Sequence, residues 1–61
     1  MTFIRVTHAL SNTPVLLNLD SISWIMPDDY HKGQYQVECY SSHISVDEYD
    51  YQRILAALGI R

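Results

Sequence analysis

Two groups of side chains in this sequence could carry chemistry, and the first is a thiol near an imidazole. Cys39 is the single cysteine among 61 residues, and His43 follows it four positions later. On paired strands the two could act as a nucleophile and its base. However, Cys39 continues an apolar alternation that includes Val37, and a free thiol on such a face usually behaves as a small hydrophobic side chain. We therefore expect Cys39 to be buried and unreactive.

The second group is a polar stretch with two carboxylates and an imidazole. Asp28, Asp29 and His31 are close enough in the chain to offer ligands to a divalent cation. A calcium loop needs more oxygen ligands at alternating positions, and Tyr30 and Lys32 interrupt the series. The stretch therefore predicts a solvated loop. The sequence predicts no metal, no cofactor and no enzymatic activity.

Aromatic side chains are the remaining candidates for a functional surface. Five residues are tyrosines and one is tryptophan. Tyrosine and tryptophan are enriched at interfaces because they combine a large contact area with a polar tip. We expect Tyr35 and Tyr51 to pack in the core. Tyr30, Tyr40 and Tyr49 fall in a loop, on a polar strand face and at a helix start, so they are candidates for a surface that contacts a subunit or partner.

Trp24 and the basic residues complete this candidate surface. Trp24 lies in the most apolar stretch, which favours the core, with a subunit interface as the alternative. In an oligomer that encloses a nucleotide, aromatic rings would stack on bases and arginines or lysines, Arg61 among them, would meet phosphates. The candidate residues for a partner or ligand surface are Tyr30, Tyr40, Tyr49, Trp24, Arg5, Lys32 and Arg53.

The elements that would position these residues follow from hydrophobic periodicity. The stretch Pro14–Ile25 holds the densest apolar alternation, and Asp20-Ser21 divides it into two strands. In the second of these, Ile22, Trp24 and Met26 are expected to share a face. Ser41-Ser42 is the expected two-residue turn of a later hairpin. Strands are predicted at 2–7, 15–19, 22–26, 34–40 and 43–46.

After the last predicted strand the periodicity becomes helical. Apolar residues at i, i+3, i+4 and i+7 predict a helix over Asp47–Leu58. Asp47 is the expected N-cap, and Ser45 with Glu48 is an alternative capping box. Gly59 is the expected C-terminal stop. The sequence therefore predicts an α+β fold, a small antiparallel sheet or half-open barrel of about five strands followed by one C-terminal helix.

Size and charge limit the functions open to this chain. Residues 1–61 make one domain, and a domain this short is only marginally stable alone. One cysteine excludes an internal disulfide, so we expect a homo-oligomer. The net charge of −3 and the scattered basic residues disfavour binding of a nucleic-acid polymer. No apolar run is long enough to predict a membrane span, and the free thiol suits a reducing, cytoplasmic setting.

The whole pattern also resembles a known family. It combines a strand FIRVT, the stretch PVLLNLDSISWI, a strand pair ending in ISVDE, and a short helix. In this arrangement it is similar to small flagellar-motility proteins of the FlbD/SwrD-like family. The residues that carry the resemblance are Ile4, Val6, Thr7, Leu16, Leu17, Asn18, Ile22, Ile25, Val46 and Glu48. The resemblance implies a non-enzymatic accessory protein that acts through protein contacts.

Two functions follow as expectations. The first is a small, oligomeric, non-enzymatic protein-binding or adaptor module with a protein partner of unknown identity. The alternative is a phage-type small protein that sequesters a nucleotide signal, as a ligand sponge, or inhibits a host effector. A small nucleotide is thus a possible second ligand, and neither function requires a catalytic residue.

Overall fold

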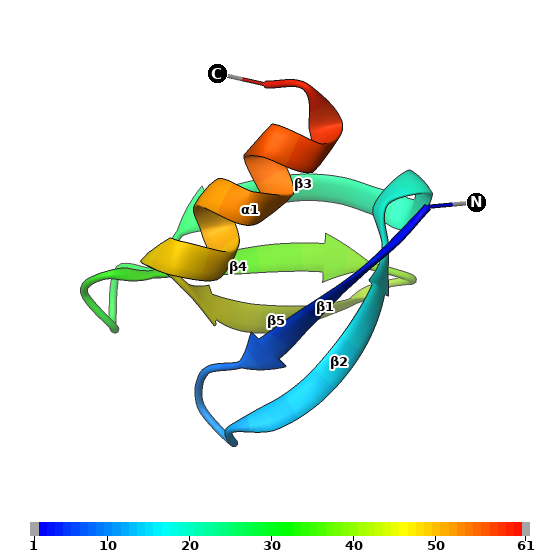
Figure 1. Cartoon of the computed structure of the whole chain (residues 1–61). Helices are drawn as coiled ribbons and strands as arrows, with labels where there is room; N and C mark the ends of the chain where they lie inside the picture. The colour runs from blue at the N-terminus through cyan, green and yellow to red at the C-terminus, as the bar shows by residue number, and fades with distance from the viewer. Residues whose placement is uncertain (1, 61) are drawn as a thin grey trace.

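The computed structural model describes residues 2–60 and contains five strands and one C-terminal helix (Figure 1). This confirms the predicted α+β fold. Among the described residues, no helix is both long enough and apolar enough to cross a membrane. The elements, in chain order, are β1 (Phe3–His8), β2 (Thr13–Asn18), the 3-10 turn η1 (Leu19–Ser21), β3 (Ile22–Pro27), β4 (Gln34–Cys39), β5 (Ser42–Asp47) and α1 (Glu48–Leu58).

The strands form two antiparallel sheets that do not close into a barrel. One sheet has the order β1-β2 and the other the order β3-β4-β5. The end of β1 runs beside β5, where the Ala9 N–H donates to the Ser45 carbonyl (2.7 Å) and the Ser45 N–H donates to His8 Nδ1 (3.3 Å). These bonds join the sheets through β1 and β5. The structure therefore stays open, with β2 and β3 at its two outer edges.

The hydrophobic core lies between the sheets and α1. The helix packs on β5, β1 and β4, and Ile54 from its middle is completely buried. The predicted alternation of β4 is confirmed, because Val37 is buried while Tyr35 and Cys39 pack against the core from the same face. The buried apolar residues are Val6, Leu17, Leu19, Val37, Val46 and Ile54.

A sharp corner separates β2 from β3, as the Asp20-Ser21 interruption predicts. The Asn18 side chain accepts a hydrogen bond from the Asp20 N–H (3.0 Å) and so caps the 3-10 turn. Its amide group donates to the Tyr40 hydroxyl (3.1 Å). Asn18 is buried, and one side chain therefore fixes both the corner and the position of the distant β4–β5 turn.

The predicted face of β3 is wrong because the strand contains a bulge. Its register with β4 shifts between Ile22 and Trp24, which leaves Ser23 as the extra residue. Beyond the bulge the strict alternation is offset by one position. Ile22 and Ile25 pack against the core, whereas Trp24 and Met26 are exposed. Trp24 therefore lies outside the core, although its position in the most apolar stretch predicted that it would be buried.

The β4–β5 turn is one residue earlier than predicted. Cys39 pairs with Ser42, so the two turn residues are Tyr40 and Ser41 rather than Ser41-Ser42. Both have left-handed backbones, with φ of 52° and 64°. A two-residue hairpin turn favours positive φ because it matches the twist of the strands, although glycine or asparagine usually supplies it.

The predicted helix ends are confirmed. The Asp47 side chain accepts the Asp50 N–H (2.9 Å), as an N-cap does. Gly59 ends the helix with φ of 78°, and its N–H donates to the Ala56 carbonyl. The alternative capping box is not formed, because the Glu48 carboxylate instead accepts hydrogen bonds from Tyr35 and Gln52.

Candidate functional site

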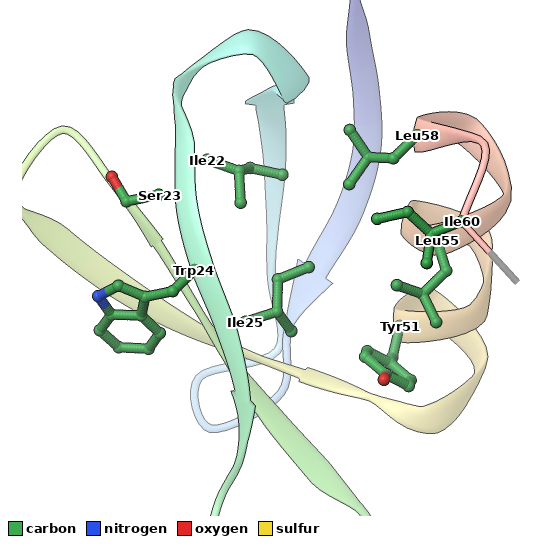
Figure 2. Close-up of a pocket in the computed structure, with 8 residues that line it drawn as sticks. All are labelled: Ile22, Ser23, Trp24, Ile25, Tyr51, Leu55, Leu58 and Ile60. Carbon is green, nitrogen blue, oxygen red and sulfur yellow. The ribbon is translucent and has the colours of Figure 1, made fainter.

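An apolar groove of about 360 Å³ lies between β3 and α1 (Figure 2). Ile22 and Ile25 point from β3 toward the helix, and Leu55 and Leu58 point from the helix toward the strand. All of the lining residues are uncharged, so the groove suits an apolar occupant. They are Ile22, Ser23, Trp24, Ile25, Tyr51, Leu55, Leu58 and Ile60.

The groove exists because the helix covers the sheet unevenly. α1 packs mainly against β5, β1 and β4, so the layer between sheet and helix is open beside β3. Leu58 is 37% exposed and Ile60 is 52% exposed, although both are large apolar residues. The apolar stripe of the helix thus continues past the part of the sheet that it covers. This leaves hydrophobic surface that a further chain segment would bury.

Tyr51 lines this groove at the end near the start of the helix, and it pairs with Tyr35, which is not part of the lining. The rings of Tyr35 and Tyr51 stack 3.7 Å apart with 6° between their planes. The Tyr35 hydroxyl donates to Glu48 (2.9 Å), and this hydrogen bond raises the pKa of Tyr35. Hydrogen bonds from Gln52 and then Tyr35 lower the pKa of Glu48. The expectation that Tyr35 and Tyr51 pack with the core is confirmed, because both are partly buried against it.

The strand that borders the groove also has an unpaired edge. Within the part of the chain that the structure describes, β3 pairs with β4 and with no other strand. Its outer N–H and C=O groups can therefore pair with an added strand. The bulge at Ser23 and Pro27 at the far end limit the regular stretch to residues 24–26. Only a short segment in one register would fit this edge.

Acidic residues lie at both ends of β3. Asp20 precedes the strand in η1 and is exposed. Asp28 and Asp29 follow it, and Asp29 is exposed while Asp28 is buried. Lys32 lies in the same loop and offsets one of these charges. The uncharged groove therefore runs along a strand whose two ends are both acidic.

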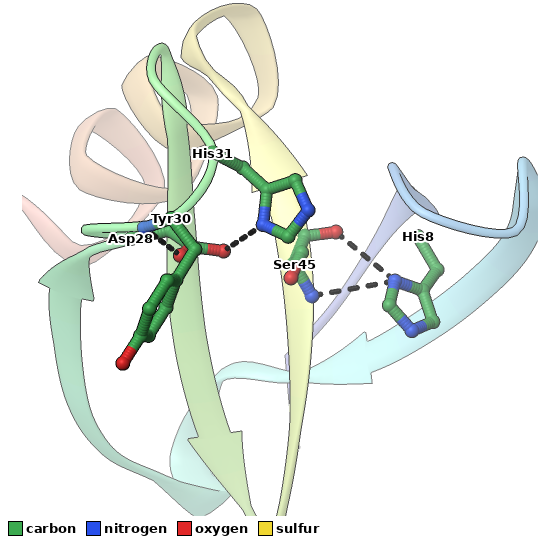
Figure 3. Close-up of polar contacts among 5 residues, drawn as sticks. All are labelled: His8, Asp28, Tyr30, His31 and Ser45. Carbon is green, nitrogen blue, oxygen red and sulfur yellow. Dashed lines mark hydrogen bonds and ion pairs between the residues drawn. The ribbon is translucent and has the colours of Figure 1, made fainter.

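Asp28 organises the loop that follows β3 (Figure 3). One carboxylate oxygen accepts the Tyr30 N–H (2.9 Å), and the other lies 3.1 Å from His31 Nδ1. The Tyr30 N–H is the main cause that lowers the pKa of Asp28; burial opposes it and His31 adds to it. The carboxylate therefore fixes the turn that carries Tyr30, a residue that is 90% exposed.

The residues predicted for a partner surface do not gather in one place. Trp24 lines the groove, at its rim, with the indole pointing away from the helix in Figure 2. Tyr30 and Lys32 lie in the loop after β3, and Tyr40 lies in the β4–β5 turn. Hydrogen bonds from Ser21 and then Asn18 lower the pKa of Tyr40. Tyr40 thus has an internal role, although its ring is largely exposed.

Tyr49, Arg53 and Arg5 do lie close together, on the side of α1 that faces β1. Arg53 forms an ion pair with buried Asp50 (2.9 Å) and donates to the Arg5 carbonyl (2.9 Å). Its guanidinium also lies 5.7 Å from the centre of the Tyr49 ring. Asp50 in turn accepts the Thr7 N–H (3.0 Å). This cluster joins the helix to β1, so Arg53 is already engaged within the molecule.

A shallow hollow lies on the outer face of the other sheet. It is lined by Arg5, Pro14, Val15 and Leu16, and Leu16 is among the most exposed apolar residues. Arg5 and Leu16 are directly opposite one another on β1 and β2. This surface combines one cation with exposed apolar groups and lies apart from the groove. Arg61, the remaining predicted basic group, lies outside the described residues.

The candidate chemical groups are not brought together. Cys39 packs against the core, whereas His43 is exposed and belongs to the other face of the sheet. Asp28 and His31 contact each other, but within residues 2–60 no three histidine, cysteine or acidic side chains cluster as a metal site would require. Asp28 instead fixes its own loop.

Sequence reasoning named Trp24 as a candidate surface residue but missed the other groove residues. Leu55 and Leu58 belong to the helical stripe that periodicity predicts to be buried. Ile60, beyond the glycine stop, received no role. No local signal in the sequence distinguishes Leu55 and Leu58 from buried members of the same stripe, because their exposure depends on where α1 crosses the sheets.

No protein-family model, curated protein or solved structure matches this chain. The fold and the groove therefore define its class: a small open α+β domain with an apolar groove beside an unpaired strand edge.

Proposed function

We propose that this chain is a non-enzymatic protein-binding module whose groove receives an extended segment of another protein. The observation that carries the proposal is the position of the apolar groove alongside β3, a strand with one unpaired edge. A segment that pairs with this edge adds a strand to the sheet. Its inward side chains then lie in the layer between sheet and helix, next to Ile25 and opposite Leu58.

The uncharged lining supports a protein segment over a nucleotide. A nucleotide would need cations near its phosphates, but the described basic residues, Arg5, Lys32 and Arg53, lie outside the groove. Arg53 is also paired with Asp50. A protein segment that binds through apolar side chains and backbone hydrogen bonds needs no cation in the groove. The adaptor function is therefore the one that this geometry favours.

Self-association is a second part of the proposal. Six apolar residues are buried among the described residues, while many large ones are exposed, including Phe3 and Leu16 on the outer face of β1 and β2. A second copy could cover that face and leave the groove free for the partner. A small oligomer in a reducing, cytoplasmic setting would then present several grooves.

The proposal can be tested by selecting random peptides of about 12 residues on the folded chain. Binders are then measured by calorimetry against Leu58→Glu and Ala57→Glu. Both variants add one charge to the last turn of α1, but Leu58 lines the groove and Ala57 does not. We expect Leu58→Glu to weaken binding about tenfold or more, because it places a charge in an apolar site, and Ala57→Glu to change it little.

Circular dichroism would verify that both variants remain folded. If no peptide is selected, or if the selected peptides bind Leu58→Glu as well as the parent chain, the groove is not the binding site and the proposal is wrong.

A further inference from the structure

We infer that the segment received by the groove is apolar in its middle and basic at both ends. This inference rests on the proposed function and specifies the partner's chemistry. The groove contributes no charge, whereas β3 has Asp20 before it and Asp29 after it, both exposed. A segment paired with β3 must pass both carboxylates, and cationic ends would neutralise them.

The acidic character is not confined to the ends of the strand. Glu38 pairs with Trp24 across the β3–β4 ladder, in the middle of the regular stretch. Lys32 is the basic residue of the nearby loop, whereas the acids in or beside β3 that form no ion pair among the described residues are Asp20, Asp29 and Glu38. Arg5 and Arg53 lie at the β1 side of the helix, away from the groove. The charged residues along β3 are therefore mainly acidic.

The same charges argue against a second copy as the occupant. Antiparallel twofold pairing of β3 with itself would set the end that carries Asp20 against the end that carries Asp29 of the other copy. This would occur at both ends of the pair, and like charges placed opposite each other on paired strands are destabilising. Each copy also carries a net charge of −3. A basic segment of a different protein would avoid both the like charges at the strand ends and the repulsion between two negatively charged copies.

Strand geometry sets the spacing of the basic residues. β3 has six residues, which span about 20 Å at the usual rise. The flanking cations of a paired segment should therefore be about seven positions apart. Between them, residues at alternate positions would face the groove, and these should be apolar and preferably β-branched.

The experiment uses the peptides selected on the folded chain. We expect lysine or arginine on both sides of an apolar alternation. Replacing these cations with glutamine should weaken binding about fivefold at low salt, as expected for two exposed ion pairs. Asp20→Asn combined with Asp29→Asn should remove that dependence. Leu10→Lys combined with Thr13→Lys is the matched control, because it changes the net charge by the same two units at exposed positions of the β1–β2 hairpin that do not line the groove.

The outcomes separate this inference from the proposed function. Peptides that depend on Leu58 but bind equally well with neutral or acidic ends would overturn the inference and leave the function intact. Binding that is insensitive to Leu58→Glu would overturn the function itself. If sedimentation shows an oligomer that Leu58→Glu alone dissociates, the occupant is a second copy, and the inference is wrong.

Discussion

At the scale of single residues, the ionisation of Asp28, which holds the loop after β3, makes the stability of the fold depend on pH. Its folded pKa is lowered, chiefly by the Tyr30 N–H, so the ionised carboxylate stabilises the folded state. This contribution is fully present above the unfolded pKa of about 4 and is lost as the pH falls through the lower folded value. We therefore expect the free energy of unfolding to fall below about pH 4, and to fall less in Asp28→Asn.

Urea denaturation at fixed ionic strength between pH 6 and pH 3 would measure this. Glu48, whose pKa is also lowered, contributes in the same direction, so Glu48→Gln should remove a separate part of the acid loss. Identical pH profiles for Asp28→Asn and the parent chain would contradict the assignment.

Sequence reasoning identified which residues are polar but not which polar residues are buried. It took Asp28 as part of a solvated loop, and it treated Asn18 only as part of a motif. It also did not predict that the Asp50 carboxylate accepts a hydrogen bond from the N–H of Thr7, 43 positions away. Such contacts depend on how α1 packs against β1. The periodicity within one element does not predict how two elements pack.

At the scale of elements, the β4–β5 turn is the place where the sequence fits its backbone least well. Tyr40 and Ser41 both have positive φ, which costs a non-glycine residue free energy. Ser41→Gly should raise the free energy of unfolding by about 0.5 kcal/mol, since the relief of strain exceeds the entropy that glycine adds to the unfolded chain. Thermal unfolding should show an increase of about 3 °C.

Ser42→Gly provides the control for this change. Ser42 begins β5 with an extended backbone, where glycine weakens a strand, so this variant should be less stable than the parent. Equal effects of the two substitutions would show that the backbone of Ser41 is not strained.

The elements themselves were largely predictable because each has a local signal. Alternation indicated the strands, Asp47 and Gly59 marked the ends of the helix, and the corner after β2 followed from its polar residues. The bulge at Ser23 was not predictable, because it depends on register with β4 rather than on residues 22–26 alone. That single offset decided which face of β3 carries Trp24.

At the scale of the whole molecule, small size predicts association. The exposed apolar residues Phe3 and Leu16 lie on adjacent strands of one outer face. Sedimentation at micromolar concentration should show an oligomer, and Leu16→Lys should shift it toward the monomer because it places a charge in the contact. Ala57→Lys, at an exposed position of α1 that is not on this face, is a charge-matched control. A parent chain that is monomeric at these concentrations would refute the expectation.

The open groove could not be predicted because it arises from the arrangement of complete elements. The wall formed by α1 is an apolar stripe that periodicity predicted, whereas the face that β3 presents was predicted wrongly because of the bulge. Whether two such faces meet or stay apart depends on where the helix crosses the sheets. Here it lies over β5, β1 and β4, and so the space beside β3 remains open.

The position of Trp24 has a practical consequence. It is the single indole in the chain, and it lies partly exposed on the rim of the groove. Tryptophan emission shifts toward the blue when water around the ring is displaced, whereas the tyrosines contribute little under selective excitation. The protein therefore carries a built-in optical reporter at the very place where occupancy would be sensed, without any added dye.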